Sequence, residues 1–544
     1  MGLELGGQGA PDGLRGEGGV DRGEGEVDDA GLVAAVPGIA TAAPDVSRGA
    51  SLTGDPFTLG VASGDPWPDG FVLWTRLALD PLAEDGLGGM PSRPVQVSWE
   101  VAEDEGMRSV VRRGSEIARP ESAHAVHVEL HGLRPGREYW YRFRTARHLS
   151  PVGRALTTPA WDETPAALAM AFASCSQYEH GWFTAYRRLA EDQPDLVLHL
   201  GDYQYEYRAE SYVSGDGNVR DHEGPETVDL PTYRLRHAQY KTDEDLQAAH
   251  AVAPWLVVWD DHEVDNNWAA GIPENRDAGQ GNDTDERFRR RRAAAFQAYW
   301  ENMPLRRPSA PTGDRMRIYR RVQWGQLANF HMLDTRQYRD DQLAGDGWDE
   351  NVAERWDPAR SITGAAQEKW LLDGFRSSTA RWDLLGQQVF FAERDRAQAP
   401  EVDDVSMDGW DGYAASRERI VRGWQDAGVR NPVVLTGDVH RHWAADIRAD
   451  VRDPDAPVVG SELVCSSITS TGDGSGATTD PMMAWNPHLR FYADQRGYVR
   501  TRITPEVMTA DFRVLDRVTV PGAAATTKAS WVLEDGVRGL QRRG

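Results

Sequence analysis

The sequence predicts an α/β protein in which a layered α/β domain follows a smaller all-β domain. Two changes of pattern along the chain carry this prediction. Between about residues 57 and 158, short stretches alternate between apolar and polar residues, as in strands with one buried face. After Pro159, continuous apolar runs alternate with segments of helical spacing, a pattern typical of buried strands separated by helices.

Length and composition limit the class of protein. The chain has 544 residues, which favours two domains, or one large domain with additions, over a single small core. The 85 acidic and 60 basic residues leave a formal charge of −25, which argues against a nucleic-acid backbone or an anionic membrane surface as partner. No apolar run approaches the roughly 18 residues of a membrane-spanning helix. The two cysteines, Cys175 and Cys465, could form one bridge but no disulfide framework.

Residues 1–54 are predicted to be a disordered or signal-like segment. They are rich in Gly, Ala, Asp and Glu and show no periodicity. The stretch Ala30–Ala43 has the small residues of a signal-peptide end, but the acidic tract Glu24–Asp29 precedes it, where a signal peptide carries positive charge. The first 50 residues contain no paired arginine, so the sequence shows no clear signal peptide.

Residues 55–160 are predicted to form a β-sandwich of the immunoglobulin or fibronectin type III kind. Val95–Val101 and Ala125–Leu130 alternate in polarity, which indicates strands. His131–Gly136 supplies a turn, and Glu138–Arg144 begins another strand. Short alternating strands separated by turns are typical of such sandwiches.

Residues 161–515 are predicted to form the α/β domain, and residues 516–544 a C-terminal tail or capping segment. Apolar residues between Trp182 and Ala190 recur at helical spacing, and Ala344–Asp357 is expected to be an inserted loop. Five apolar runs predict buried strands: Ala167–Ala173, Asp195–Leu200, Trp255–Trp259, Leu327–Leu333 and Val433–Thr436.

Polar side chains directly follow four of these runs. The four loops are Ser174–Ser176, Gly201–Tyr205, Asp260–Glu263 and Gly437–His440. Because ligands of α/β sheets bind beyond the carboxyl ends of the strands, we expect the loops to converge. Each loop alone would fit a turn, a solvated acidic loop or buried packing. Together they predict a metal site.

The residue types in the four loops indicate the chemistry. Carboxylates suit hard cations, whereas thiolate, phenolate and imidazole suit a transition metal such as iron. A carboxylate such as Asp202 can bridge two metals. Two metals about 3.5 to 4 Å apart can bind a phosphate, activate a water and stabilise the leaving oxygen. Hydrolysis of a phosphate ester is therefore the predicted reaction.

These loops resemble known families. Gly201–Tyr205 fits the Gly-Asp-x-x-Tyr motif of purple acid phosphatases, and Asp261–Glu263 takes the place of Asn-His-Glu or Asn-His-Asp in metallophosphoesterases. The fuller resemblance, over about residues 57–516, is to PhoD-type alkaline phosphatases. Its motifs are Leu59–Pro66, Val72–Arg76, Ser174–Ser176, Trp259–Val264 with Asn266–Trp268, His331–Arg336, Gly364–Leu371 and Gly437–His440.

The PhoD resemblance implies a fold and a set of metals. The fold would be the four-layer αββα sandwich of metallophosphoesterases, preceded by the all-β domain. One Fe3+ would be held by Cys175, Asp202, Tyr205 and His440. One or two Ca2+ would lie nearby, with Asp202 bridging and with Asp261 and Asp438 as ligands. Both of these carboxylates depart from the Asn and His of the common metallophosphoesterase pattern and favour a harder cation than zinc. Among Asp260, Asp261, Asn266 and Asn267, the residue that reaches the metal is left open.

Two residues are expected to act on the substrate. His262 would donate a hydrogen bond or proton to the phosphate, or else orient a metal ligand. Arg336 would bind a phosphate oxygen bidentately, or else pair with Asp334. No Ser or Thr stands beside an evident base in these motifs, so attack by a metal-bound hydroxide without a phosphoenzyme is the predicted mechanism.

The predicted function is hydrolysis of phosphomonoesters, diesters or both, with small-molecule or lipid esters as substrates. A phospholipase D-like phosphodiesterase is the first alternative, since two metals can serve both ester types. A noncatalytic metal-containing binding protein is the second, although the apparently complete ligand set argues against it. A purple acid phosphatase proper would carry Asn at position 261 and His at position 438. The resemblance implies an extracytoplasmic location; the sequence indicates no oligomeric state.

Overall fold

The computed structural model describes residues 52–274 and 285–542, which lie in one compact unit spanning Val46–Gly544. Nearly all of the predicted disordered or signal-like segment, residues 1–51, lies outside the described residues. Within them, no helix has the length and apolar character needed to cross a membrane.

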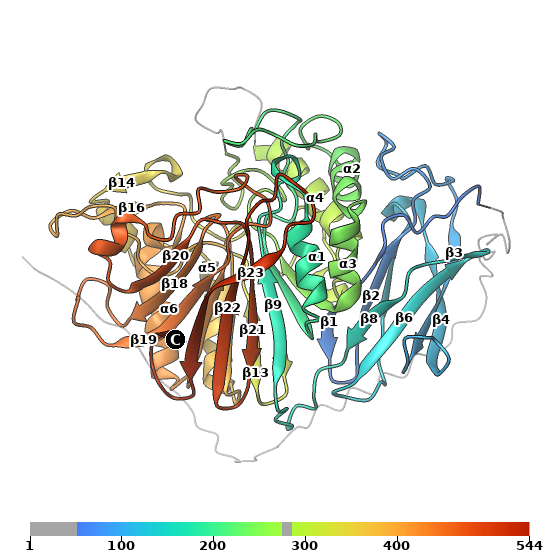
Figure 1. The fold of residues 1–544 in the computed structure, drawn as a ribbon. Helices are drawn as coiled ribbons and strands as arrows, with labels where there is room; N and C mark the ends of the chain where they lie inside the picture. The colour runs from blue at the N-terminus through green and yellow to red at the C-terminus, as the bar shows by residue number, and fades with distance from the viewer. Residues whose placement is uncertain (1–51, 275–284, 543–544) are drawn as a thin grey trace, which may run out of the picture. The chain divides into compact units, whose positions relative to one another are not determined.

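A ten-stranded sheet forms the first large layer (Figure 1). Three central strands, β9, β10 and β11, run parallel to one another. Their apolar runs are buried, as is typical of parallel strands covered on both faces of a sheet. In sheet order the strands are β24 (Gln541–Arg542), β23 (Ala525–Glu534), β22 (Val507–Leu515), β21 (Gly497–Ile503), β9 (Leu168–Ala173), β10 (Leu196–Leu200), β11 (Pro254–Val258), β1 (Val61–Trp67), β2 (Gly70–Arg76) and β5 (Ala125–Glu129).

A seven-stranded sheet forms the second large layer. Strands β13, β15, β17 and β19 are mutually parallel, so their carboxyl ends lie at one edge. In sheet order the strands are β12 (Arg320–Trp324), β13 (Ala328–Met332), β15 (Trp382–Gly386), β17 (Pro432–Thr436), β19 (Val458–Val464), β18 (His442–Arg448) and β20 (Leu489–Ala493). The five strands predicted for the α/β domain are confirmed as β9, β10, β11, β13 and β17.

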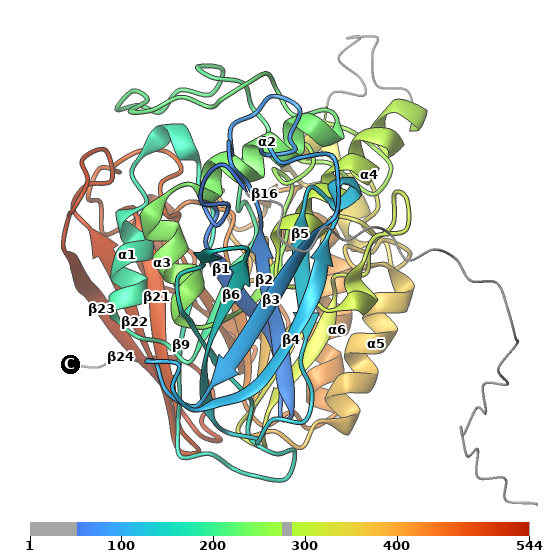
Figure 2. The same ribbon diagram turned by 90° about the vertical axis from the view of Figure 1, so that its right-hand side faces the viewer.

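Side chains of both large sheets share one hydrophobic core. Leu198 of β10 and Leu256 of β11 belong to the same buried cluster as Phe330 of β13 and Leu384 of β15. Helices α1 (Thr184–Glu191), α3 (Glu244–Val252) and α4 (Asp285–Asn302) add side chains to this core. A second core joins the seven-stranded sheet to α5 (Gly364–Ser377) and α6 (Ala414–Asp426). Figure 2 shows α5 and α6 at one side of the sheets and α1 and α3 at the other.

The predicted all-β segment is shared between two sheets. Strands β1, β2 and β5 join the ten-stranded sheet, because Ser63 of β1 pairs in parallel with Pro254 of β11. The remaining strands form a five-stranded sheet: β3 (Val95–Ala102), β4 (Val110–Ala118), β6 (Glu138–Thr145), β7 (His148–Leu149) and β8 (Gly153–Leu156). Phe71 and Leu73 pack against Val97 and Tyr139 between the two sheets. No local pattern in the sequence indicated the pairing of β1 with β11.

Two other segments also contain strands. Residues 516–544, expected to be a tail or cap, supply β23 and β24 to the ten-stranded sheet. The expected inserted loop 344–357 contains β14 (Trp348–Glu350), which pairs with β16 (Asp404–Ser406) in a separate two-stranded sheet.

Helix α2 (Leu230–Lys241) begins with a capping box in which the Asp229 carboxylate accepts the Thr232 backbone N–H.

Candidate metal centre

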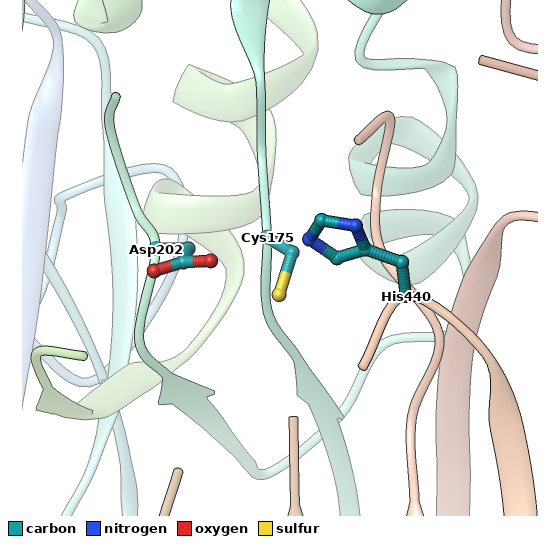
Figure 3. A group of neighbouring side chains, drawn as sticks. All are labelled: Cys175, Asp202 and His440. Carbon is teal, nitrogen blue, oxygen red and sulfur yellow. The ribbon is translucent and has the colours of Figure 1, made fainter. Parts of the chain in front are cut away.

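The four loops predicted to converge meet between the two large sheets. Cys175 follows β9, Asp202 follows β10 and His440 follows β17. Each of these three residues offers one ligand atom, and the three atoms lie within 4.8 Å of one another, as Figure 3 illustrates. A thiol, a carboxylate and an imidazole from two different sheets therefore surround one point, and such a donor set suits a transition metal.

A second group shares Asp202 with the first. Ligand atoms of Asp202, Asp261 and His262 also lie within 4.8 Å of one another. The buried Oδ1 atom of Asp202 has no hydrogen-bond partner among the described residues. A buried, unpartnered carboxylate oxygen is costly unless a cation binds it, so the residues fit a bridged pair of metal ions.

Tyr205 belongs to the first group. Its phenol oxygen donates to Oδ2 of Asp202 at 2.9 Å and lies 3.2 Å from Nε2 of His440. It also accepts a hydrogen bond of 2.8 Å from the Ser470 hydroxyl. Burial, with the neighbouring Asp202 charge, raises the pKa of Tyr205 well above its ordinary value, so a bound cation would be needed to ionise the phenol.

The ligand residues occupy unusual backbone conformations. Cys175, Asp202, Asp438 and His440 have φ values of 61°, 55°, 62° and 54°. Left-handed φ is uncommon for residues with a Cβ and costs energy, and such residues cluster at functional sites. Gly201 has φ 106°, and a Cβ there would overlap Asp260. The chain thus turns sharply at each strand end, which directs the side chains into the site.

Glu263 joins the loops that follow β10 and β11. Its buried carboxylate accepts the backbone N–H groups of Asp202, Tyr203 and Asp260 at 3.1, 2.6 and 2.9 Å. Burial raises its pKa to about 7, against the effect of these three hydrogen bonds. The glutamate of the Asp-Asp-His-Glu motif therefore positions the ligand loops.

His262 is held from one side by Glu206. Its Nδ1 lies 2.8 Å from Oε2 of the buried Glu206, and its ring stacks on Tyr205 with centroids 4.1 Å apart. Burial lowers the pKa of His262, but the charges of Glu206 and Asp261 outweigh it and raise the pKa well above the ordinary value. An imidazole that is oriented and favours its proton can donate a hydrogen bond to an anion.

Arg336 binds carboxylates rather than facing the site with free donors. Its Nε donates to Asp260 at 2.6 Å, and its two Nη atoms donate to the two oxygens of Asp408 at 2.7 and 3.0 Å. The side chain is fully buried. The contact of Arg336 with Asp334 is limited to its backbone N–H, which donates to the Asp334 carboxylate at 3.1 Å. The guanidinium therefore does not pair with Asp334, whereas its contact with a phosphate oxygen stays a prediction.

The structure distinguishes the residues of the acidic loop. Asp261 lies with Asp202 and 3.8 Å from Arg336, whereas Asp260 pairs closely with Arg336 at 2.6 Å. Asn267 donates its backbone N–H to Asp261 at 2.8 Å, and Asn266 donates its amide to Glu274. Of the four candidates left open by the sequence, Asp261 is therefore the one that the geometry favours as a metal ligand.

Asp438 stands apart from the two groups of close ligand atoms formed by the described residues. Its side chain is partly exposed, and burial together with the Asp408 charge raises its pKa to about 7.

Both cysteines are free; the Ser174 hydroxyl lies 3.2 Å from Sγ of Cys175 and 3.3 Å from Sγ of Cys465.

Several residues that shape the site were missed from the sequence. Ser470 and Thr471 follow the buried strand β19, so the pattern that identified the other loops applied to them as well. Glu206 directly follows the Gly-Asp-x-x-Tyr motif, but nothing local indicated its contact with His262. Asp408 lies in the short turn after β16, where the sequence carried no signal.

The strand ends of two sheets bring carboxylates, imidazoles, a thiol and a phenol to one buried point. Such a donor set fits an enzyme of the metal-dependent hydrolase class. Comparison with known proteins specifies the family. Residues 170–512 match the family described as PhoD-like phosphatase, and residues 41–159 match its N-terminal domain. The chain belongs to the PhoD-like phosphatase family and is an enzyme of the alkaline phosphatase type.

Individual relatives agree with this assignment. The chain is 50% identical to alkaline phosphatase D of Bacillus subtilis (strain 168) over 500 residues, which cover 92% of this chain and 84% of the relative. A solved structure titled "Structure of PhoD" superposes with a TM-score of 0.87 at 49% identity, covering 91% of this chain and 93% of the other.

Proposed function

We propose that the enzyme hydrolyses phosphomonoesters, phosphodiesters or both with one Fe3+ and one or two Ca2+ at the described centre. The observation that carries the proposal is the position of Asp202, which is common to both groups of close ligand atoms. A carboxylate in that position can bridge two cations, and paired cations suit phosphoryl chemistry.

The donor set supports the choice of metals. Cys175, Tyr205 and His440 offer the thiolate, phenolate and imidazole ligands that suit iron, with Asp202 as the fourth ligand. Asp261 offers an additional carboxylate close to Asp202, and Asp438 lies in the same loop as His440. Carboxylate oxygens are what Ca2+ prefers. When bound, the cations would supply Lewis acidity to the phosphoryl oxygens and to a water molecule.

The chain's own residues hold and orient the reacting groups. Glu263 fixes the backbone of Asp202, and Arg336 holds Asp260, the residue before Asp261. Glu206 holds Nδ1 of His262, which leaves the other ring nitrogen for a phosphate oxygen. We propose water as the nucleophile, without a phosphoenzyme.

We propose several finer points on the same basis. The packing of helices and sheets corresponds to the four-layer αββα sandwich, with residues 161–515 as the catalytic domain. Residues 55–160 act as an N-terminal domain, of which β1, β2 and β5 pair into the ten-stranded sheet. The protein is extracytoplasmic and accepts small-molecule or lipid phosphate esters. These points rest on the family relationship rather than on a contact in the site.

The test combines metal analysis with hydrolysis. The purified protein should contain about one iron per chain, show a visible charge-transfer band, and hydrolyse p-nitrophenyl phosphate or its bis-ester better with added calcium. Tyr205→Phe should lose the band together with activity. Tyr141→Phe, which alters another fully buried tyrosine in β6, is the matched control and should keep both. A colourless, iron-free protein that hydrolyses neither ester would refute the proposal.

A further inference from the structure

The loop that follows β15 leaves the seven-stranded sheet at the ligand-binding edge. β15 runs parallel to its neighbour β17, whose carboxyl end carries Asp438 and His440. Residues that follow the two strands therefore emerge side by side. This loop contains Arg394, and it leads through the short strand β16 to Asp408, which binds Arg336.

Arg394 has a guanidinium without a polar partner. Its Cζ lies 4.3 Å from the ring centroid of Phe390 and 5.3 Å from that of Trp348. Among the described residues the guanidinium makes no hydrogen bond and no ion pair, and its Nε is buried and unpartnered. The side chain is nevertheless only half-buried. Burying donors without acceptors is costly, so a missing acceptor is the simplest explanation of this arrangement.

Other arginines in the same region are already paired. Arg339 donates to the same Asp408 oxygen as Arg336, at 2.7 Å. Arg396, two residues beyond Arg394, stacks on the same Trp348 ring at 4.4 Å but pairs with both oxygens of Asp404. Arg394 differs from Arg336, Arg339 and Arg396 because its guanidinium is not engaged by a carboxylate of the described residues and is available to a ligand.

The loop that carries Arg394 adjoins a ligand loop, because the Gly437 backbone N–H donates to the Gln388 carbonyl at 2.9 Å. A continuous series of ring contacts links the two loops: Phe390 packs on Trp443 with centroids 5.9 Å apart, and Trp443 packs on Tyr492 at 4.7 Å. The Tyr492 hydroxyl accepts from Arg441, the residue after His440. Buried aromatic rings thus connect Phe390, which lies under the Arg394 guanidinium, with the ligand loop.

We infer that Arg394 is a substrate-binding residue whose guanidinium receives an anionic oxygen of the phosphate ester held at the metal centre. This inference rests on the proposed function. A planar guanidinium over aromatic rings is weakly hydrated and matches phosphate geometry with two donors. In a chain of charge −25, an unpaired cation at this edge also offsets the repulsion that an anionic substrate meets.

The experiment compares Arg394→Met with Arg396→Met in the metal-loaded full chain. Inorganic phosphate binding is measured by calorimetry, and KM and kcat are measured with p-nitrophenyl phosphate. Arg394→Met should weaken phosphate binding and raise KM about 10- to 100-fold, the effect of losing a charged hydrogen bond, with a smaller change in kcat. Arg394→Lys should recover part of the affinity. Arg396→Met should stay within about twofold of wild type, since its partner is Asp404.

Equal phosphate affinity and KM in wild type and Arg394→Met would overturn the inference, and so would a wild-type protein that binds no phosphate. Iron content and melting temperature show whether each variant is folded; if Arg394→Met is not, the Arg394→Lys values decide. A wild-type protein that binds phosphate through Arg394 but hydrolyses no ester would instead refute the proposed function alone.

Discussion

The Nδ1 atom of His440 lies 2.8 Å from Oγ1 of Thr471, although the two residues follow different strands of the seven-stranded sheet. The other ring nitrogen, Nε2, faces the phenol of Tyr205. Thr471 is itself fixed, because its backbone N–H donates to Nδ1 of His180 at 3.0 Å. The imidazole is thus oriented from behind by a residue outside the ligand set, as is common for metal-binding histidines.

Loss of this contact should weaken metal binding. Thr471→Val removes the hydroxyl and keeps the shape, so we expect iron affinity to fall about 10- to 100-fold. Competition with a chelator, followed by elemental analysis, measures the change. Thr471→Ser retains an oxygen and should stay close to wild type. Iron retention by the valine variant equal to wild type would show that the contact is dispensable.

Removal of Arg336 should destabilise the fold. Arg336→Met leaves the buried Asp260 without a cation and leaves Asp408 with Arg339 alone, so we expect the free energy of unfolding to fall by about 3 to 5 kcal/mol. Urea unfolding monitored by fluorescence measures it. Arg336→Lys should not restore the loss, because lysine cannot bind Asp408 with two parallel donors. Unchanged stability with weaker phosphate binding would instead favour the direct phosphate contact expected from the sequence.

Glu206 and His262 should act as one unit. Glu206→Gln weakens the buried contact that orients the imidazole, so we expect kcat to fall about 10- to 100-fold. His262→Asn should cost at least as much, and the double variant no more than His262→Asn alone. Steady-state hydrolysis of p-nitrophenyl phosphate provides the comparison. Fully additive losses would contradict a shared role.

The C-terminal strand should contribute an acid-sensitive contact. Asp535, just after β23, accepts two hydrogen bonds from Arg430 at 2.6 and 2.7 Å and one from Arg381 at 2.9 Å. The Arg430 contact lowers the pKa of Asp535 from 3.8 to about 2. The ionised carboxylate therefore stabilises the fold above its unfolded pKa, and this contribution is lost as the pH falls from about 4 to about 2.

Asp535→Asn should remove about 1 kcal/mol of stability at neutral pH, a small value because the partner Arg430 is half-exposed to solvent. The difference between wild type and variant should shrink below about pH 4, as measured by urea unfolding at several pH values. A difference that stays constant down to pH 2 would show that the carboxylate does not titrate in this way.

Much of the fold was predictable because local pattern reports burial. The run Leu196–Leu200 is apolar throughout and is fully buried as β10, and the polar residues after it form the site as expected. Pairing between distant strands was not predictable, since β1 and β11 are separated by many residues and neither run specifies its neighbour. For the same reason residues 525–534 were expected to be a tail, although Ala525–Glu534 extends a sheet.

The sequence by itself determined which residue types stand at the strand ends, because strand periodicity and the chemistry of Cys, Asp, Tyr and His are local properties. Only the tertiary structure decided how the acidic residues are used. Asp261 lies with Asp202, whereas Asp260 and Asp408 accept the hydrogen bonds of Arg336, which is 3.8 Å from Asp261. That division depends on distances between loops of two sheets, and the order of residues along one chain does not encode such distances.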